Sequence, residues 1–149
     1  MAQNCYAYAV NHPAPIDPGD LSNSHYNGIG DVGKAAVRDG LIKKQPMSTV
    51  PNEYYVVALW VSSDGDNYHW ARREGDGRWS HKPGEGDTRY TDANEQEIND
   101  DNPPDDCDMN FLIFFESKAD VLKKMAIAQG WAINYDIFSG YYLCPKNGL

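Results

Sequence analysis

The chain has 149 residues, of which 22 are acidic and 13 basic, so its formal net charge is −9. This length allows one domain with a real core, and ten tyrosines and four tryptophans are too many for a disordered chain. The acidity disfavours binding to nucleic-acid phosphates or to an anionic membrane surface. Because no run of about 18 apolar residues is present, we expect no membrane-spanning segment.

The first predicted element is a short helix over residues 4–10. Asn4 is a good N-cap, which makes Cys5 the first helical residue. Residues 11–33 are rich in proline, glycine and small polar residues, which is typical of a loop. Residues 31–44 place apolar side chains near one face of a second, amphipathic helix.

The central part of the chain is predicted to be extended. A continuous apolar run at residues 54–61 indicates the strongest strand, buried on both faces. Residues 68–74 and 78–81 predict two further strands, joined by a tight turn at 75–77. The segment 82–108 that follows is irregular and acidic.

Toward the C-terminus, residues 111–115 predict a third apolar strand, and residues 117–129 predict a helix that starts with a capping box. Two short strands are predicted at 131–135 and 141–144. We therefore expect one α+β domain over residues 1–149, in which the helix carrying Cys5 packs on a mainly antiparallel sheet. Its core spans residues 1–115, and a β-α-β-β extension ends the chain over 116–149.

The three cysteines, Cys5, Cys107 and Cys144, are far apart and form no Cys-x-x-Cys pair. We therefore expect neither a disulfide framework nor a zinc site, but free thiols in a reducing compartment. Nothing in the sequence implies a cofactor or a bound metal. No secretory signal is visible, so we expect a cytoplasmic protein, or one delivered by a non-classical route as phage proteins and effectors are.

Cys5 has a setting that suits a nucleophile. At a helix N-terminus the free amides and the dipole stabilise a thiolate, and the same amides can hold an oxyanion. A thiol nucleophile also needs a base, for which histidine is suited near neutral pH. His69 lies on the strand beside the central one and His81 on its hairpin partner, whereas His12 and His25 lie in the N-terminal loop.

The geometry of the two strand histidines depends on the hairpin loop. If residues 75–77 form a three-residue loop, Ala71 faces His81. His69 and His81 then become diagonal neighbours about 7–8 Å apart at the backbone, a spacing that allows a hydrogen bond between the imidazoles. If residues 76–77 form a two-residue turn instead, His81 moves to the opposite face.

A cysteine at a helix start, a central strand and two strand histidines twelve residues apart together resemble the NlpC-type peptidases. These are papain-like cysteine hydrolases of bacterial cell-wall turnover, and local strings also look like segments of divergent bacterial and phage proteins. The resemblance implies a papain-like fold with Cys5 as nucleophile, His69 as base and His81 as orienting group. Asn4 stands where the family often has an acid, and Tyr6 follows where it has small residues.

The resemblance implies cleavage of a peptide or amide bond, such as that of a peptidoglycan-like cell-wall peptide, through an acyl-enzyme. Asn4 and Asp92 are further candidates for stabilising the oxyanion or orienting the base. Aromatic residues that flank the expected site are candidates for a substrate groove, although core packing is the default for such side chains. These candidates are Tyr6, Trp70 and Trp79.

The alternative function is a catalytically inactive papain-like protein, a binding or accessory protein of phage or bacterial origin. Its partner would be a protein that meets the acidic loop 85–108. This loop holds ten acidic residues and one basic residue, Arg89, so its balance of −9 equals that of the whole chain. Its aspartates lack the spacing and central glycine of an EF-hand, which indicates a solvated acidic loop.

Gly28, Gly30 and Gly33 match a dinucleotide-binding fingerprint by spacing. No strand precedes them, because prolines occupy that part of the chain, and the motif requires a strand before its first glycine. The three glycines therefore indicate a loop that leads into a helix.

Overall fold

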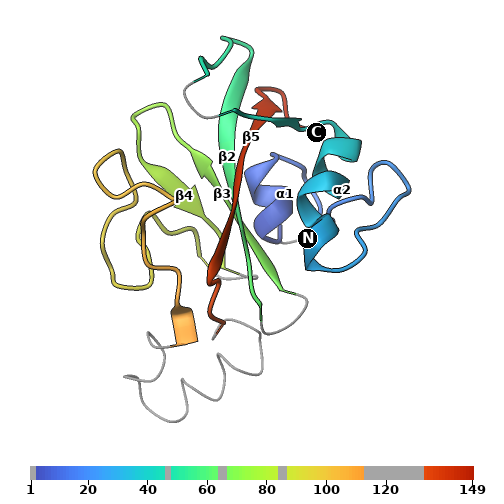
Figure 1. Cartoon of the computed structure of the whole chain (residues 1–149). Helices are drawn as coiled ribbons and strands as arrows, with labels where there is room; N and C mark the ends of the chain where they lie inside the picture. The colour runs from blue at the N-terminus through green and yellow to red at the C-terminus, as the bar shows by residue number, and fades with distance from the viewer. Residues whose placement is uncertain (1–2, 46–47, 64–66, 84–86, 113–132) are drawn as a thin grey trace.

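The computed structural model describes residues 3–45, 48–63, 67–83, 87–112 and 133–149 (Figure 1). Within these residues, five antiparallel strands form one sheet in the order β1-β5-β2-β3-β4. The strands are β1 (Ile42–Lys43), β2 (Tyr54–Val61), β3 (Tyr68–Arg73), β4 (Trp79–His81) and β5 (Ile137–Pro145). The helices are α1 (Cys5–Ala9) and α2 (Val32–Asp39), with a 3-10 helix η1 (Ile29–Asp31) before α2.

The central strand β2 is apolar on both sides because it lies between two layers. Successive side chains of a strand point to opposite faces, so β2 divides its residues between two buried clusters. Val57, Leu59 and Val61 pack with the helices, whereas Val56, Ala58 and Trp60 pack against the other layer. The predicted bounds of this strand, 54–61, are confirmed.

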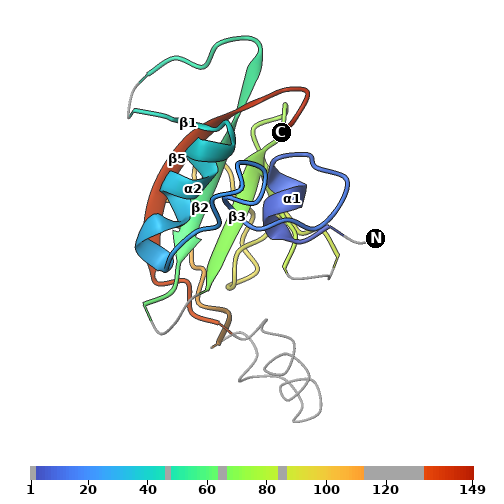
Figure 2. The same ribbon diagram turned by 90° about the vertical axis from the view of Figure 1, so that its right-hand side faces the viewer.

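The helical layer is formed by α1 and α2, which face the viewer in Figure 2. The carboxamide oxygen of Asn4 accepts a hydrogen bond from the Ala7 amide at 3.0 Å, which confirms Asn4 as the N-cap of α1. Gly40 ends α2 with a φ of 128°, a backbone conformation that glycine adopts without a Cβ penalty. The predicted helix over 31–44 is therefore too long, and residues 42–43 form β1 instead.

The other face is covered by residues 87–112, drawn in yellow and orange in Figure 1, on the side away from α1 and α2. This segment, which we call the irregular layer, buries Ala93, Ile98 and Met109 against the sheet. Its backbone is tied to the sheet edge, because the Trp79 amide donates to the Ile98 carbonyl at 2.9 Å. The Trp60 indole adds a hydrogen bond to the Pro104 carbonyl at 3.1 Å.

The predicted α+β papain-like, NlpC-like fold is wrong. The described chain is mostly antiparallel sheet with little helix, since α1 has five residues and α2 has eight. The physical reason is the irregular layer, which covers one face of the sheet with main-chain loops. None of the helices in the described ranges has the length and apolarity needed to cross a membrane.

The C-terminal predictions are met only in part. The strand predicted at 141–144 is confirmed as part of β5, a nine-residue strand that pairs with both β1 and β2. Of the strand predicted at 131–135, the described residues 133–135 lie outside the named strands. At 111–115 the two described residues are not in a strand, and Asn110 forms an isolated bridge with Asn134. The helix predicted at 117–129 lies outside the described residues, and the division into a core and an extension stays a prediction.

Candidate functional site

The β3–β4 hairpin adopts the register that brings its two histidines together. Ala71 pairs with His81, and the Glu74 amide donates to the Arg78 carbonyl at 2.7 Å. The three-residue loop 75–77 is thus confirmed. Nε2 of His69 lies 2.8 Å from Nδ1 of His81, so the two imidazoles form the hydrogen bond that this register allows.

The hydrogen bonds fix the tautomers of the histidine pair. Nε2 of His81 lies 2.7 Å from the Thr91 carbonyl, which can only accept, so this nitrogen carries the proton. Nδ1 of a neutral His81 is then an acceptor, and His69 donates to it through Nε2. Both histidines are neutral in this arrangement.

Both imidazoles project from the sheet and are buried against the irregular layer. The ring of Tyr135 stacks on His69 with centroids 5.2 Å apart, and the ring of Phe111 contacts both histidines. Burial, together with the neighbouring His81, holds the pKa of His69 well below its usual value. Burial also lowers the pKa of His81 to about 4, so neither ring is charged near neutral pH.

Cys5 begins α1 as predicted, but its thiol has a different environment from that of a nucleophile. The side chain packs in the apolar cluster of the helical layer, and Sγ lies 4.0 Å from the Tyr68 carbonyl. Burial raises the pKa of Cys5 to about 12, although backbone hydrogen bonds of Trp70 and Tyr6 act in the opposite direction. The thiol is therefore protonated near neutral pH.

The thiol and the histidine pair belong to opposite faces of β3. Tyr68 and Trp70 point to the helical layer, where Cys5 lies. His69 and Ala71 alternate with them along β3 and point to the irregular layer. Among the described residues, the Cys5 thiol forms no hydrogen bond to an imidazole.

The remaining site candidates take part in capping and packing. Asn4 caps α1 and also donates its side-chain amide to the Ile16 carbonyl at 2.8 Å. Tyr6 and Trp70 contact each other in the helical-layer cluster, with centroids 5.3 Å apart. Trp79 is buried in the other cluster, against the ring of Tyr141.

Asp92 is the centre of the irregular layer. One carboxylate oxygen accepts the amides of Asn94 and Gln96 at 2.9 and 3.0 Å, and the other accepts the Asn102 side-chain amide and the Asp108 amide at 3.1 and 3.2 Å. Only 2% of Asp92 is exposed. Sequence reasoning singled out Asp92 as an orienting group for His69; in the structure it orients the surrounding loops.

Around Asp92 the loops carry a dense set of exposed carboxylates, which we call the acidic platform (residues 87–108). Eight of its nine acidic residues are exposed, all except Asp92. They are Asp87, Glu95, Glu97, Asp100, Asp101, Asp105, Asp106 and Asp108. Since the loops beneath them are hydrogen-bonded and partly buried, the backbone positions that carry these charges are well defined.

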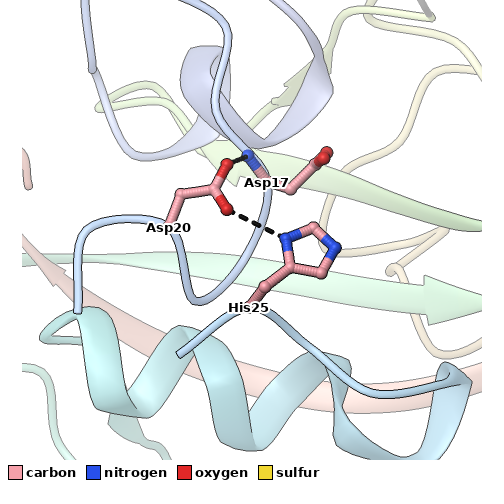
Figure 3. A group of neighbouring side chains, drawn as sticks. All are labelled: Asp17, Asp20 and His25. Atoms are coloured by element: carbon pink, nitrogen blue, oxygen red, sulfur yellow. Dashed lines mark hydrogen bonds and ion pairs between the residues drawn. The ribbon is translucent and has the colours of Figure 1, made fainter. Parts of the chain in front are cut away.

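A cluster that sequence reasoning missed lies in the N-terminal loop. Ligand-type atoms of Asp17, Asp20 and His25 lie within 4.8 Å of one another (Figure 3), a donor set suited to a divalent cation. Each residue also has a structural partner: Asp20 accepts from the Asp17 amide at 2.8 Å and contacts His25 Nδ1 at 2.9 Å, and Tyr68 donates to Asp17 at 2.6 Å. The spacing Asp17-x-x-Asp20 was the available signal in the sequence.

Two surface grooves lie away from these groups. One lies near the start of β2 and the end of β3, beside Tyr54, Arg73 and Lys146. The other has a volume of about 470 Å³ and lies between α2 and the β1–β5 edge, beside Lys34 and Lys43. Neither of these two grooves is lined by Cys5, His69 or His81.

Comparison with known proteins shows similarity to a shell-matrix protein, whereas the sequence analysis expected a bacterial or phage peptidase. The chain is 34% identical over 93 residues to insoluble matrix shell protein 1 of Ruditapes philippinarum. The match covers 60% of this chain and 61% of that protein, so the chain spans less than two thirds of its relative. No protein-family model matches the chain, and no solved structure matches it.

These comparisons overturn the resemblance to NlpC-type peptidases. No peptidase family matches, and the similar protein is a mollusc shell-matrix protein instead of a bacterial or phage enzyme. The prediction of a cysteine hydrolase, whether thiol protease or amidase, is wrong for the same reason. The protonated thiol and the separation of Cys5 from His69 by the sheet give the physical basis of this correction.

Proposed function

We propose that this chain is a non-catalytic structural protein that binds a positively charged partner through its acidic platform. The observation that carries the proposal is the eight exposed carboxylates on loops organised by the buried Asp92. Exposed charges carried on well-defined backbone positions favour encounter with a partner of opposite charge. The similarity to an insoluble shell-matrix protein supports a structural role.

The distribution of charge along the chain supports the acidic platform as the binding surface. The loop 85–108 carries a balance of −9, which is the whole excess of the chain, so the remainder is near neutral. A cationic partner is therefore attracted to one side of the molecule. Asp100 pairs with Arg73 of the same chain at 3.5 Å, but 79% of the Asp100 side chain is exposed, which leaves it accessible to another cation.

Binding of poly-lysine, measured by calorimetry at low salt, tests the platform. The variant D101N/D106N removes two exposed platform charges, whereas D20N/E53Q removes two exposed charges elsewhere. We expect the platform variant to bind several-fold more weakly and the control to bind nearly as the unmodified protein does. Equal weakening by both pairs would mean that net charge alone attracts the polycation, and the proposal would fail.

The reactivity of Cys5 tests the absence of catalysis. With its pKa raised to about 12 by burial, the Cys5 thiol is protonated at pH 7. We therefore expect iodoacetamide to label Cys5 of the folded protein about a thousandfold more slowly than an ordinary thiol, and no faster than Cys107. Mass spectrometry of native and urea-unfolded protein measures both rates. Preferential, rapid labelling of native Cys5 would overturn the non-catalytic assignment.

A further inference from the structure

The groove between α2 and the β1–β5 edge lies on the opposite side of the molecule from the acidic platform. Its volume is about 470 Å³, and it takes residues from α2, β1 and β5. The platform adjoins β4, at the other edge of the sheet, and covers the face away from the helices. Figure 1 shows this opposition, with α2 on the right and the orange segment on the left.

The groove presents two lysines that can accept a partner. Arg38, also in the groove, is already paired with Asp31 at 2.9 Å. Lys34 is exposed and forms no ion pair with the described residues. Lys43 lies over the Tyr142 ring at 4.6 Å and donates to the Ser139 carbonyl at 3.1 Å, which holds its ammonium in place and leaves further N–H groups to donate.

The neighbouring strand residue Gly140 allows this position of Lys43. A side chain at residue 140 would collide with the lysine ammonium, and the φ of 134° there also favours glycine. The sequence thus keeps the Lys43 charge against the sheet edge. Such preorganisation lowers the entropic cost of binding an anion.

Tyr142 supplies a third donor. Only 5% of this residue is exposed, and its hydroxyl forms no hydrogen bond within the described residues. The hydroxyl ends against Gly33, which also lines the groove. Although most of the Tyr142 ring is buried, the hydroxyl itself stays accessible at the groove. A carboxylate in the groove would accept its proton together with those of the lysines.

The acidic platform carries a feature of matching shape and charge. Residues 99–102 form a tight turn in which Asn99 and Asn102 exchange backbone hydrogen bonds of 3.2 and 3.1 Å. Asn99 also accepts the Asp101 amide through its side chain at 2.9 Å. The turn carries Asp100 and Asp101, both exposed, so it presents two carboxylates on a short backbone of fixed geometry.

We propose that the acidic platform meets the lysines of a second copy of this chain, whose groove between α2 and the β1–β5 edge receives Asp100 and Asp101 in the 99–102 turn. The inference rests on the proposed function, because it names the partner of the acidic platform. The lysine ammoniums and the Tyr142 hydroxyl donate to the two carboxylates. Because groove and turn lie on opposite sides of the chain, the contact is head to tail and adds copies into open chains.

Sedimentation velocity and light scattering over a concentration series measure this association. We expect the unmodified protein to associate at about 1 mM or below in ~0.1 M salt, which screens the long-range repulsion between two chains of net charge −9 while close ion pairs persist. It should dissociate as the salt concentration is raised further. K34Q/K43Q in the groove and D100N/D101N in the turn should each weaken association about tenfold or more. A protein that stays monomeric across the whole salt and concentration series overturns the proposal.

A matched control separates a specific contact from general charge. D87N/D106N removes two exposed platform charges outside the turn and should leave association within about twofold of the unmodified protein. A mixture of K34Q/K43Q with D100N/D101N has one intact groove and one intact turn, so it should form dimers but no longer chains. Chains in this mixture, or equal effects of the two aspartate pairs, overturn the head-to-tail contact.

The same variants separate this inference from the proposed function. If the aspartate variants weaken poly-lysine binding while K34Q/K43Q leaves self-association unchanged, the groove is not the partner site, and the platform keeps its binding role. If neither aspartate pair changes poly-lysine binding or self-association, the proposed function fails as well.

Discussion

The two faces of the sheet are covered by different means, although each layer is held by one carboxylate. On the helical side, Asp39 accepts the amides of Gly19 and Ser22 at 2.7 and 3.0 Å and the Tyr6 hydroxyl at 2.7 Å. On the other side, Asp92 accepts four N–H donors and is almost completely buried.

The difference shows how a segment without helix can serve as a core layer. A helix satisfies its own backbone, whereas loops need other partners for each buried amide. In the irregular layer the partners come from Asp92 and from main-chain bridges such as Thr91 to Glu97. The layer can then bury Ile98 and Met109 while it presents charges to solvent.

Replacement of the two organising carboxylates tests this comparison most strongly. We expect Asp92→Ala to lower the free energy of unfolding by about 3 kcal/mol or more, since four donors lose a charged acceptor. Asp39→Ala should cost less, about 1–2 kcal/mol, because Asp39 is partly exposed and water can replace it. Urea unfolding followed by tryptophan fluorescence measures both.

Asp106→Asn serves as the control, since this exposed residue should change stability by no more than about 0.5 kcal/mol. A cost for Asp39→Ala that equals or exceeds that of Asp92→Ala would contradict the assignment of Asp92 as the main organiser.

Acid should weaken the irregular layer through its histidine pair. Unfolded histidines take up protons below about pH 6.5, whereas burial holds the pKa of folded His81 at about 4 and that of His69 well below its usual value. Protons therefore favour the unfolded state in this window. As pH falls from about 6.5 toward 4, the free energy of unfolding should drop by up to ~1.4 kcal/mol per pH unit for each histidine.

The double variant H69Q/H81Q should flatten this pH dependence, measured by urea unfolding between about pH 6.5 and 5, where most carboxylates remain ionised. H12Q/H25Q, which removes the two histidines of the N-terminal loop, serves as the comparison. If the pH dependence flattens in H12Q/H25Q and not in H69Q/H81Q, the acid sensitivity arises on the helical side of the sheet.

The smallest expected effect lies in the helical layer. Asn4→Ala removes the N-cap of α1 and should cost about 1 kcal/mol, whereas Asn4→Asp keeps a capping oxygen and should retain most of the stability. Thermal unfolding of both variants measures the difference. An alanine variant as stable as the unmodified protein would mean that packing alone holds α1 in place.

The sequence was sufficient for the existence of the hairpin and for the start of α1, but it left the length of the hairpin loop open. Strong apolar content predicted β2, and the glycines around Asp76 indicated a turn whose three-residue form sets the contact between His69 and His81. Asn4 was readable as a cap because capping is a local interaction. These features depend on residues that are near in sequence.

The relation between Cys5 and His69 could not be predicted for a physical reason. Alternation shows that His69 and Trp70 point to opposite faces, but β2 is apolar on both, so the pattern does not show which face α1 covers. Asp92 was equally hard to distinguish, because in sequence it resembles the exposed acids around it. The full extent of β5 could not be predicted, because the polar Ser139 and Gly140 interrupt its apolar pattern.

The place of β5 in the sheet has a consequence for the order of folding. β5 lies between β1 and β2, and its residues pair with strand residues about 80 to 100 positions earlier in the chain. During synthesis, one long apolar edge of β2 therefore stays unpaired until residue 145 has left the ribosome. Such an edge can recruit other chains, so nascent chains need protection from aggregation until β5 inserts.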